Sequence, residues 1–71
     1  MYQISQVFRD AIKAAGGPDS WARAHQCKSR SIRGYYLGSR RCFRGTLHEL
    51  YDDDISYWNL LGVHSWRDLA A

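Results

Sequence analysis

The sequence predicts an all-α domain of five or six short helices. Apolar residues at positions 4, 7, 8, 11, 12 and 15 follow the i, i+3, i+4, i+7 spacing that places them on one face of a helix. Glycine, proline and capping residues divide the rest of the chain into short segments of helical pattern. The 71 residues form a single domain, and a core of this size rarely supplies more than about 3–5 kcal/mol of stability.

The first two helices are delimited by strong start and stop signals. The apolar stripe predicts a first helix over residues 4–15, and the two glycines at 16–17 end it because glycine adopts the left-handed conformation found at helix C-termini. Pro18 suits the first turn of a second helix, where its missing N–H costs nothing. The expected N-cap of this helix is Asp19 or Ser20.

A short break separates the second helix from a third. Residues 26–28 form the predicted turn, and Ser29 is a suitable N-cap for a helix that runs to about residue 37. Ile32 and Tyr35 lie on its apolar side, and Gly38 stops it.

The C-terminal third predicts shorter elements. A basic loop covers residues 39–45, and the Thr46-x-x-Glu49 pattern has the form of a capping box that starts a fourth helix. The acidic run at 52–54 favours a new helix start, since carboxylates stabilise a helix N-terminus. Gly62 closes that fifth helix, and Ser65 caps a last turn. The aromatic residues of the fifth segment are also compatible with a strand.

The charge of the chain is concentrated in one block. The formal net charge is +3, but residues 20–44 hold seven Lys or Arg side chains and no acid, whereas residues 45–71 hold five acids and one Arg. Such a basic block indicates a polyanion as partner. The alternative is a solvated loop rich in arginine.

The basic block overlaps a pattern that resembles a known family. Ala22 is small enough for two helices to approach closely, and Ile32 and Tyr35, ten and thirteen residues later, are placed to seal their packing. This spacing resembles the helix-turn-helix of the Cro/phage-repressor family, and residues 11–17 are similar to the end of the first helix in Cro-like and YdaS-like regulators. The resemblance covers about residues 4–41.

The turn departs from the family pattern. Gln26 stands where the family most often has glycine, His25 where leucine is common, and Cys27 where an aliphatic residue is usual. A free cysteine behaves as a small hydrophobe, so its substitution is mild.

The resemblance implies a double-stranded DNA-binding transcriptional regulator, a Cro-like repressor of a phage or prophage. Arg30 and Arg33 share one helical face and would make bidentate contacts with guanine, whereas the arginines of the following loop would bind phosphates. Gly34 either lets the helix approach a base edge or merely weakens the helix. The implied DNA-binding residues, all within the motif at 18–37 or just after it, are Lys28, Ser29, Arg30, Arg33, Gly34, Arg40, Arg41, Arg44 and Arg23.

Such regulators bind their operators as homodimers, because two-fold pairing gives two half-sites about one helical turn apart. The aromatic region 50–71 is the candidate dimerisation region. The residues expected at the interface are Tyr57, Trp58, Leu60, Leu61, Val63 and Trp66. Their alternative role is ordinary core, which a domain this small also needs.

Other classes of function find less support. His25, Cys27, Cys42 and His48 carry zinc-binding atoms but lack the close cysteine pair of a zinc knuckle, so no metal or other cofactor is expected. A Cys27–Cys42 disulfide would need an oxidising environment. The histidines are scattered, and neither an enzyme nor a small-molecule substrate is indicated. Without a long apolar run or a signal-peptide pattern, the expected location is the cytoplasm of a bacterial host, away from the membrane.

Two alternatives stay open. The helix-turn-helix shape also suits a protein-interaction module, such as an antirepressor, an antitoxin or a phage inhibitor of a host protein. The second alternative is RNA binding through the Arg-rich loop, with bases stacked on Tyr35 and Tyr36.

Overall fold

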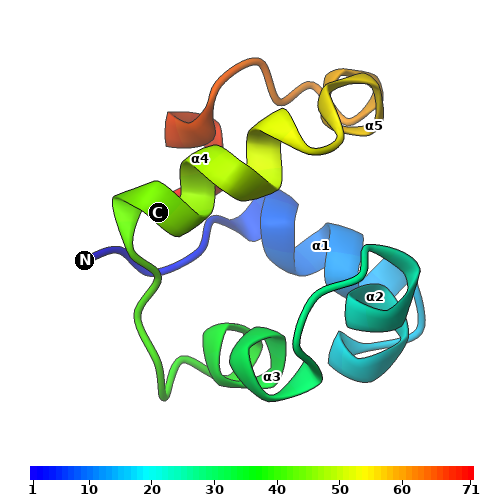
Figure 1. Ribbon diagram of the computed structural model, residues 1–71, viewed down its shortest axis with the longest axis vertical. Helices are drawn as coiled ribbons and strands as arrows, with labels where there is room; N and C mark the ends of the chain where they lie inside the picture. The colour runs from blue at the N-terminus through cyan, green and yellow to red at the C-terminus, as the bar shows by residue number, and fades with distance from the viewer.

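The computed structural model describes residues 1–71 and contains five α-helices, one short 3₁₀ helix and no strands (Figure 1). This confirms the predicted all-α class. None of the helices has the length and apolar character needed to cross a membrane. The elements are α1 (Gln6–Ala14), α2 (Pro18–Ala24), α3 (Ser29–Leu37), α4 (Arg44–Asp52), α5 (Ile55–Leu60) and the 3₁₀ helix η1 (Trp66–Leu69).

The first helix begins two residues later than its apolar stripe suggests. Ser5 is the N-cap of α1, and its hydroxyl accepts a hydrogen bond from the Phe8 N–H at 3.3 Å. Ile4 is buried, but it lies in an isolated β-bridge with Ala70 rather than in the helix. The stripe therefore identified the core face correctly and misplaced the helix start, because an extended residue before a cap can bury its side chain too.

The second helix begins with Pro18 in its first turn, as expected. Its N-cap position is occupied by Gly17, with φ +115°, and no side chain caps the helix. Neither Asp19 nor Ser20 has the predicted capping role. Both already lie inside the first turn, because proline at the first helical position shifts the helix start toward the glycine.

The connection between α2 and α3 is a tight turn over residues 25–28. Gln26, the residue that replaces the usual glycine, has φ +57° and so adopts a left-handed conformation. Lys28 occupies the N-cap position of α3, which makes Ser29 the first helical residue rather than the cap. Gly38 ends the helix in the left-handed conformation with φ +80°, as predicted.

The fourth helix also begins earlier than expected. Its N-cap is Phe43, so Thr46 and Glu49 lie inside the helix, and the capping-box prediction is wrong. The basic loop is correspondingly shorter, because Cys42 is fixed to Tyr2 by two backbone hydrogen bonds of 2.8 and 2.7 Å. This bridge ends the loop and sets the chain direction into α4.

The fifth segment forms a helix, not a strand. Asp54 occupies its N-cap position without a capping side-chain hydrogen bond, and Gly62 follows its end with φ +81°. Ser65 holds the N-cap position of η1, also without a side-chain bond.

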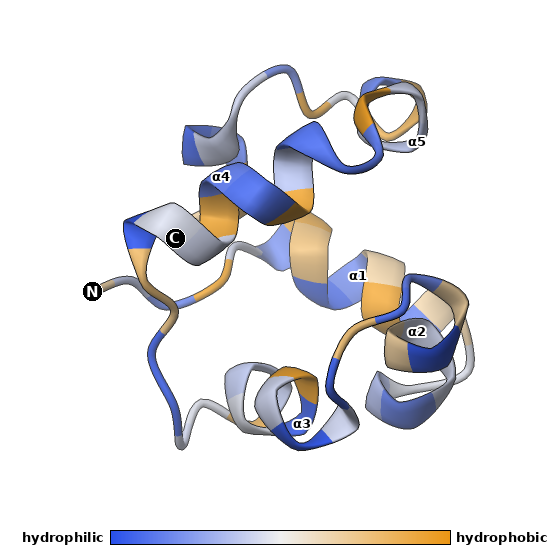
Figure 2. Cartoon of the chain, in the orientation of Figure 1, coloured by the Kyte–Doolittle hydropathy of each residue, from blue (hydrophilic) through white to orange (hydrophobic).

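One aromatic cluster connects α1 and α2 with α5. The rings of Phe8, Trp21 and Trp58 pack with centroid separations of 5.3, 5.4 and 6.0 Å. Every helix contributes at least one buried residue to the core around them, and Figure 2 shows hydrophobic positions interspersed with hydrophilic ones along the helices. Trp58 is 1% exposed, and its indole N–H donates to the Leu50 carbonyl at 2.7 Å.

The predicted dimer interface is therefore corrected in part. Trp58 and Val63 are each 1% exposed and belong to the core, so they are not available to a partner. Tyr57 and Trp66 are half-buried against the core. Only Leu60 and Leu61 are exposed, at 87% and 41%.

Candidate nucleic-acid interface

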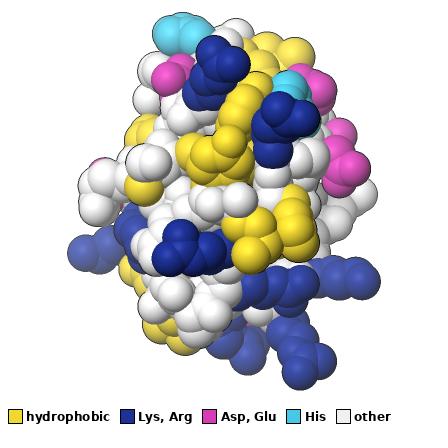
Figure 3. Space-filling model, turned by 90° about the vertical axis from the view of Figure 1, so that its left-hand side faces the viewer, with side chains coloured by type: hydrophobic (Ala, Val, Ile, Leu, Met, Phe, Trp, Pro, Cys, Tyr) yellow, Lys and Arg dark blue, Asp and Glu magenta, His cyan; other side chains and the backbone are white.

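Basic side chains gather around α3. Lys28 precedes the helix, Arg30 and Arg33 lie on it, and the loop that follows adds further arginines. Figure 3 shows most of the basic side chains toward the lower end of the molecule, where α3 lies in Figure 1, and the acidic ones in the upper half. We call the exposed residues Lys28, Arg30, Arg33, Arg40, Arg41 and Arg44 the basic face.

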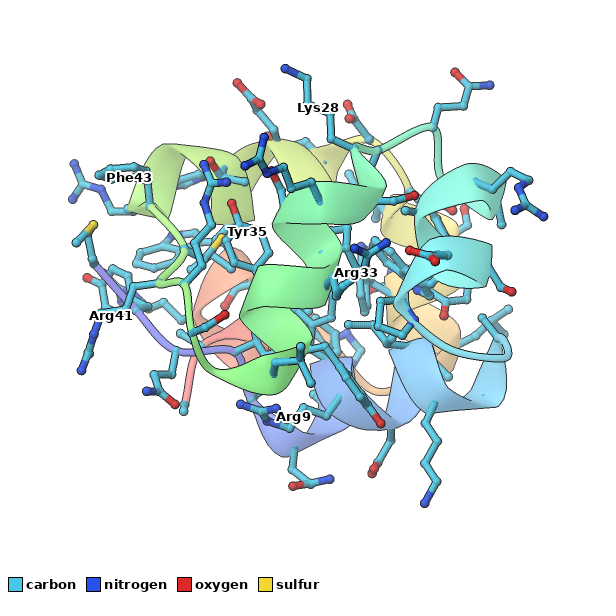
Figure 4. The ribbon with its side chains drawn as sticks, turned by 90° about the horizontal axis from the view of Figure 1, so that it is seen from below. Arg9, Lys28, Arg33, Tyr35, Arg41 and Phe43 are labelled. Carbon is cyan, nitrogen blue, oxygen red and sulfur yellow. The ribbon has the colours of Figure 1, made fainter.

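The basic face is nearly free of compensating charge. Its one ion pair joins Arg33 to Asp19 of α2 at 2.9 Å, with both side chains about half exposed. Figure 4 shows Arg33 directed from α3 toward α2. The other five basic side chains have no carboxylate within ion-pair distance. Arg30 is therefore free to bind a ligand. Arg33 already forms an ion pair with Asp19, which links α3 to α2.

Buried residues hold α3 in place from behind. Ile32 and Tyr35 of α3 are buried together with Trp21 and Ala22 of α2, as the spacing of the motif predicted. Tyr35 is only 5% exposed, and burial raises the pKa of its hydroxyl. The proposed stacking of an RNA base on Tyr35 is therefore wrong. Tyr36 is half-buried against the same core.

Gly34 has a structural role within the protein. The Arg40 N–H donates to the Gly34 carbonyl at 3.2 Å, and a Cβ added at Gly34 would lie 2.8 Å from the Cβ of Arg40. The Arg40 guanidinium lies 6.0 Å from the centre of the Tyr35 ring. The space beside Gly34 is thus filled by Arg40, and the glycine allows the loop to fold back onto α3.

Arg9 is a positioning residue that sequence reasoning missed. Its guanidinium donates to the Tyr36 carbonyl in the last turn of α3 (Figure 4). The last carbonyls of a helix lack partners within the helix, so Arg9 stabilises the end of α3 and fixes it to α1. Nothing in the i, i+4 pattern of α1 indicates this contact, which spans 27 residues of sequence.

Two predicted residues lie at the margin of the basic face. Arg23 is exposed on α2 and has no ion pair, so it is available to a ligand that extends past α3. Ser29 is half-buried at the first position of α3, where its backbone N–H has no partner within the helix.

The turn before α3 contacts the C-terminal region through His25. Its ring stacks on Trp21 at a centroid distance of 4.1 Å, and its Nδ1 lies 3.5 Å from a carboxylate oxygen of Asp54. Burial lowers the pKa of His25, and the nearby Asp54 offsets part of that effect.

The four residues with zinc-binding atoms do not form a common site. His25 is stacked on Trp21 and also contacts the ring of Tyr57. Cys42 is buried and pairs with Tyr2 of the N-terminal segment, and His48 packs on Trp66. No group of three or more His, Cys, Asp or Glu side chains lies close enough to hold a metal ion. Both cysteines are free thiols.

Comparison with protein-family models, with curated proteins and with solved structures finds no match for this chain. The resemblance to Cro-like regulators therefore stays a prediction from its residues.

Proposed function

We propose that the protein binds double-stranded DNA with α3 in the major groove and regulates transcription as a homodimer on an operator. This is the manner of the Cro/phage-repressor family that its sequence resembles. The observation that carries the proposal is the basic face, whose arginines surround an exposed helix and lack carboxylate partners apart from Arg33.

The dimensions of α3 suit this role. An α-helix with its side chains is about 10–12 Å in diameter, and the major groove of B-DNA, about 12 Å wide, admits it. The nine residues of α3 give it a length of about 13 Å for contacts along the groove. The helix is held by Arg9 at its end and by Ile32 and Tyr35 behind it. A helix fixed in this way loses little conformational freedom on binding, which favours affinity.

The residues of the basic face divide into two roles. Arg30 has no partner and lies on the exposed side of α3, so it is the principal candidate for reading a base edge. Arg33 lies on the same side, but to contact a base it must weaken or break its ion pair with Asp19. Arg40, Arg41 and Arg44, which follow the helix, are suited to phosphates, whose contacts position a protein without reading sequence.

Selection of bound sites from random duplex DNA tests the proposal directly. We expect a palindromic consensus with half-sites about one helical turn apart. Arg30→Ala should relax the preference at one base pair, which is worth about 1–3 kcal/mol of discrimination. Arg41→Ala should weaken all sequences similarly and reduce the slope of log affinity against log salt by about one. Equal effects of both changes on specific and random DNA would exclude direct readout.

The two exposed leucines at the C-terminal end of α5 favour a protein partner in addition to DNA. Leu60 is 87% exposed, and Leu61, the next residue, is 41% exposed. We propose that this surface pairs with a second copy of the chain. Sedimentation checks this proposal, because Leu60→Asp should give a monomer where the unmodified chain gives a dimer.

The same surface supports the second candidate function, an interaction module for a host protein. In that case the chain stays monomeric and its binding shows little dependence on salt. Binding to DNA through several Lys and Arg contacts should instead weaken steeply as salt rises.

A further inference from the structure

The side chain of Phe43 is forced outward by the bridge that precedes α4. Cys42 pairs with Tyr2 through backbone hydrogen bonds in both directions, and the side chain of Cys42 is fully buried. Side chains of an extended segment alternate between its two sides. The residues on either side of Cys42, Arg41 and Phe43, must therefore face solvent, and Figure 4 shows both projecting away from the body of the protein.

The backbone of Phe43 is fixed on its other side as well. It is the N-cap of α4, and its carbonyl accepts the first hydrogen bond of the helix from the Leu47 N–H at 3.0 Å. The side chain is nevertheless 57% exposed, and no aromatic ring of the chain packs on it. Tyr2, its neighbour across the bridge, packs against Trp66 at 5.6 Å. A rigid backbone thus presents an aromatic ring that contributes little to the core.

The charged residues closest to this ring in the sequence are basic. Arg41 and Arg44 flank it in sequence, are exposed and form no ion pair. Figure 3 shows exposed hydrophobic side chains next to the basic ones on this side of the molecule. A nucleic-acid strand matches this arrangement, since its charged phosphates alternate with the nonpolar surfaces of sugars and bases. An acidic protein segment would match the charges without offering a flat nonpolar partner to the ring.

We propose that Phe43 is an apolar contact residue of the DNA interface. Its ring packs on sugar or base surface of the duplex strand whose phosphates Arg41 and Arg44 bind. The inference rests on the proposed function and extends it, because it adds a contact beyond α3 that carries no charge.

The dependence of affinity on salt separates this contact from a phosphate contact. Phe43→Ala should weaken binding to the selected duplex roughly 10-fold, because about half of the Phe43 side chain is exposed in the free protein and is removed from water on binding. It should leave the slope of log affinity against log salt unchanged, because no charge is removed. Arg41→Ala should reduce that slope by about one. Phe43→Tyr retains the ring and should bind close to the unmodified chain.

Ile55→Ala is the matched control, since Ile55 is also exposed and also lies at a helix start, but beside acidic residues. It should leave DNA binding unchanged. If Phe43→Ala binds duplex within twofold of the unmodified chain, or weakens only single-stranded DNA, the inference is wrong while DNA binding stands. If the unmodified chain itself does not bind duplex DNA, the proposed function is wrong. A loss that Phe43→Tyr shares also overturns the inference.

Discussion

Residues 18–44 and residues 45–71 contribute to the same core, but their exposed side chains carry mainly opposite charge. In the first region Trp21, Ile32 and Tyr35 are buried, whereas Leu37 and Phe43 are exposed. The charged side chains exposed on α3 and its loop are all Lys or Arg. In the second, Trp58, Val63 and Leu69 are buried, while acidic side chains and Leu60 are exposed. One surface thus suits a polyanion, and the other suits a protein.

This difference shows why aromatic content alone is a poor guide to an interface. Trp58 and Leu60 lie two residues apart on α5, yet one is 1% and the other 87% exposed. The larger side chain is the one that the core needs, because it connects α1 and α2 to the C-terminal elements. Leu60, which connects no other element, stays exposed.

Among the substitutions that test this contrast, Trp58→Ala should have the largest effect on stability. Removing a buried tryptophan costs about 3–5 kcal/mol, which is close to the whole stability of a domain this small. Trp58→Ala should therefore unfold the protein or lower its thermal midpoint drastically, as followed by circular dichroism. Leu60→Ala should leave the midpoint measured at low protein concentration nearly unchanged. Equal stability of the two variants would place Trp58 outside the core.

Two helical glycines provide a smaller and sharper contrast. A Cβ at Gly34 would lie 2.8 Å from the Cβ of Arg40, whereas one at Gly45 in α4 meets nothing within 4 Å. Alanine in a helix is favoured over glycine by about 0.5–1 kcal/mol. Gly45→Ala should therefore raise the free energy of unfolding by about that amount. Gly34→Ala should gain less or lose stability, because the loop must move to relieve the clash.

The consequence for DNA binding follows from the same contact. Movement of Arg40 displaces the loop of the basic face, so Gly34→Ala should also weaken duplex binding while Gly45→Ala leaves it unchanged. Titration of labelled duplex with both variants measures this. Stabilisation of Gly34→Ala to the same extent as Gly45→Ala would show that the loop does not press on α3.

Local sequence signals predicted the helices well because each signal acts within a few residues. The 3.6-residue periodicity of α1, Pro18 at the start of α2 and Gly38 at the end of α3 all carry their information locally. The wrong start of α4 arose where distant segments meet, whereas the caps of α2 and α3 were misplaced by only one to three residues. The bridge between Tyr2 and Cys42 places the start of α4 at Arg44, and no sequence pattern within residues 39–49 indicates this bridge.

The same distinction between local signals and distant contacts applies to the candidate site. The exposure of Arg30 and the burial of Ile32 and Tyr35 were predictable from helical spacing. The bond from Arg9 to the end of α3 depends on packing between helices 27 residues apart, and sequence reasoning could not find it. Gly34 was recognised as unusual, but its reason, the return of Arg40 onto the helix, is a tertiary contact.

The smallest expected effect concerns His25, which connects the two regions through its contact with Asp54. Burial lowers the pKa of His25 in the folded protein, whereas the unfolded chain keeps the ordinary value of about 6.5. The unfolded chain therefore binds the extra proton first as pH falls. The contribution of His25 to stability is fully present above pH of about 6.5 and is lost as pH falls through the folded pKa.

His25→Gln, which keeps a polar group but cannot titrate, isolates this effect. Asp54 and Asp53 on one side, and Asp10 across the groove between α1 and α5, are the charged groups that face the ring. Urea unfolding at pH 7 and pH 5 should show a larger loss of stability for the unmodified chain than for the variant. A larger loss in the variant would mean that the ion pair with Asp54 outweighs burial and that protonation strengthens the contact between the turn and α5.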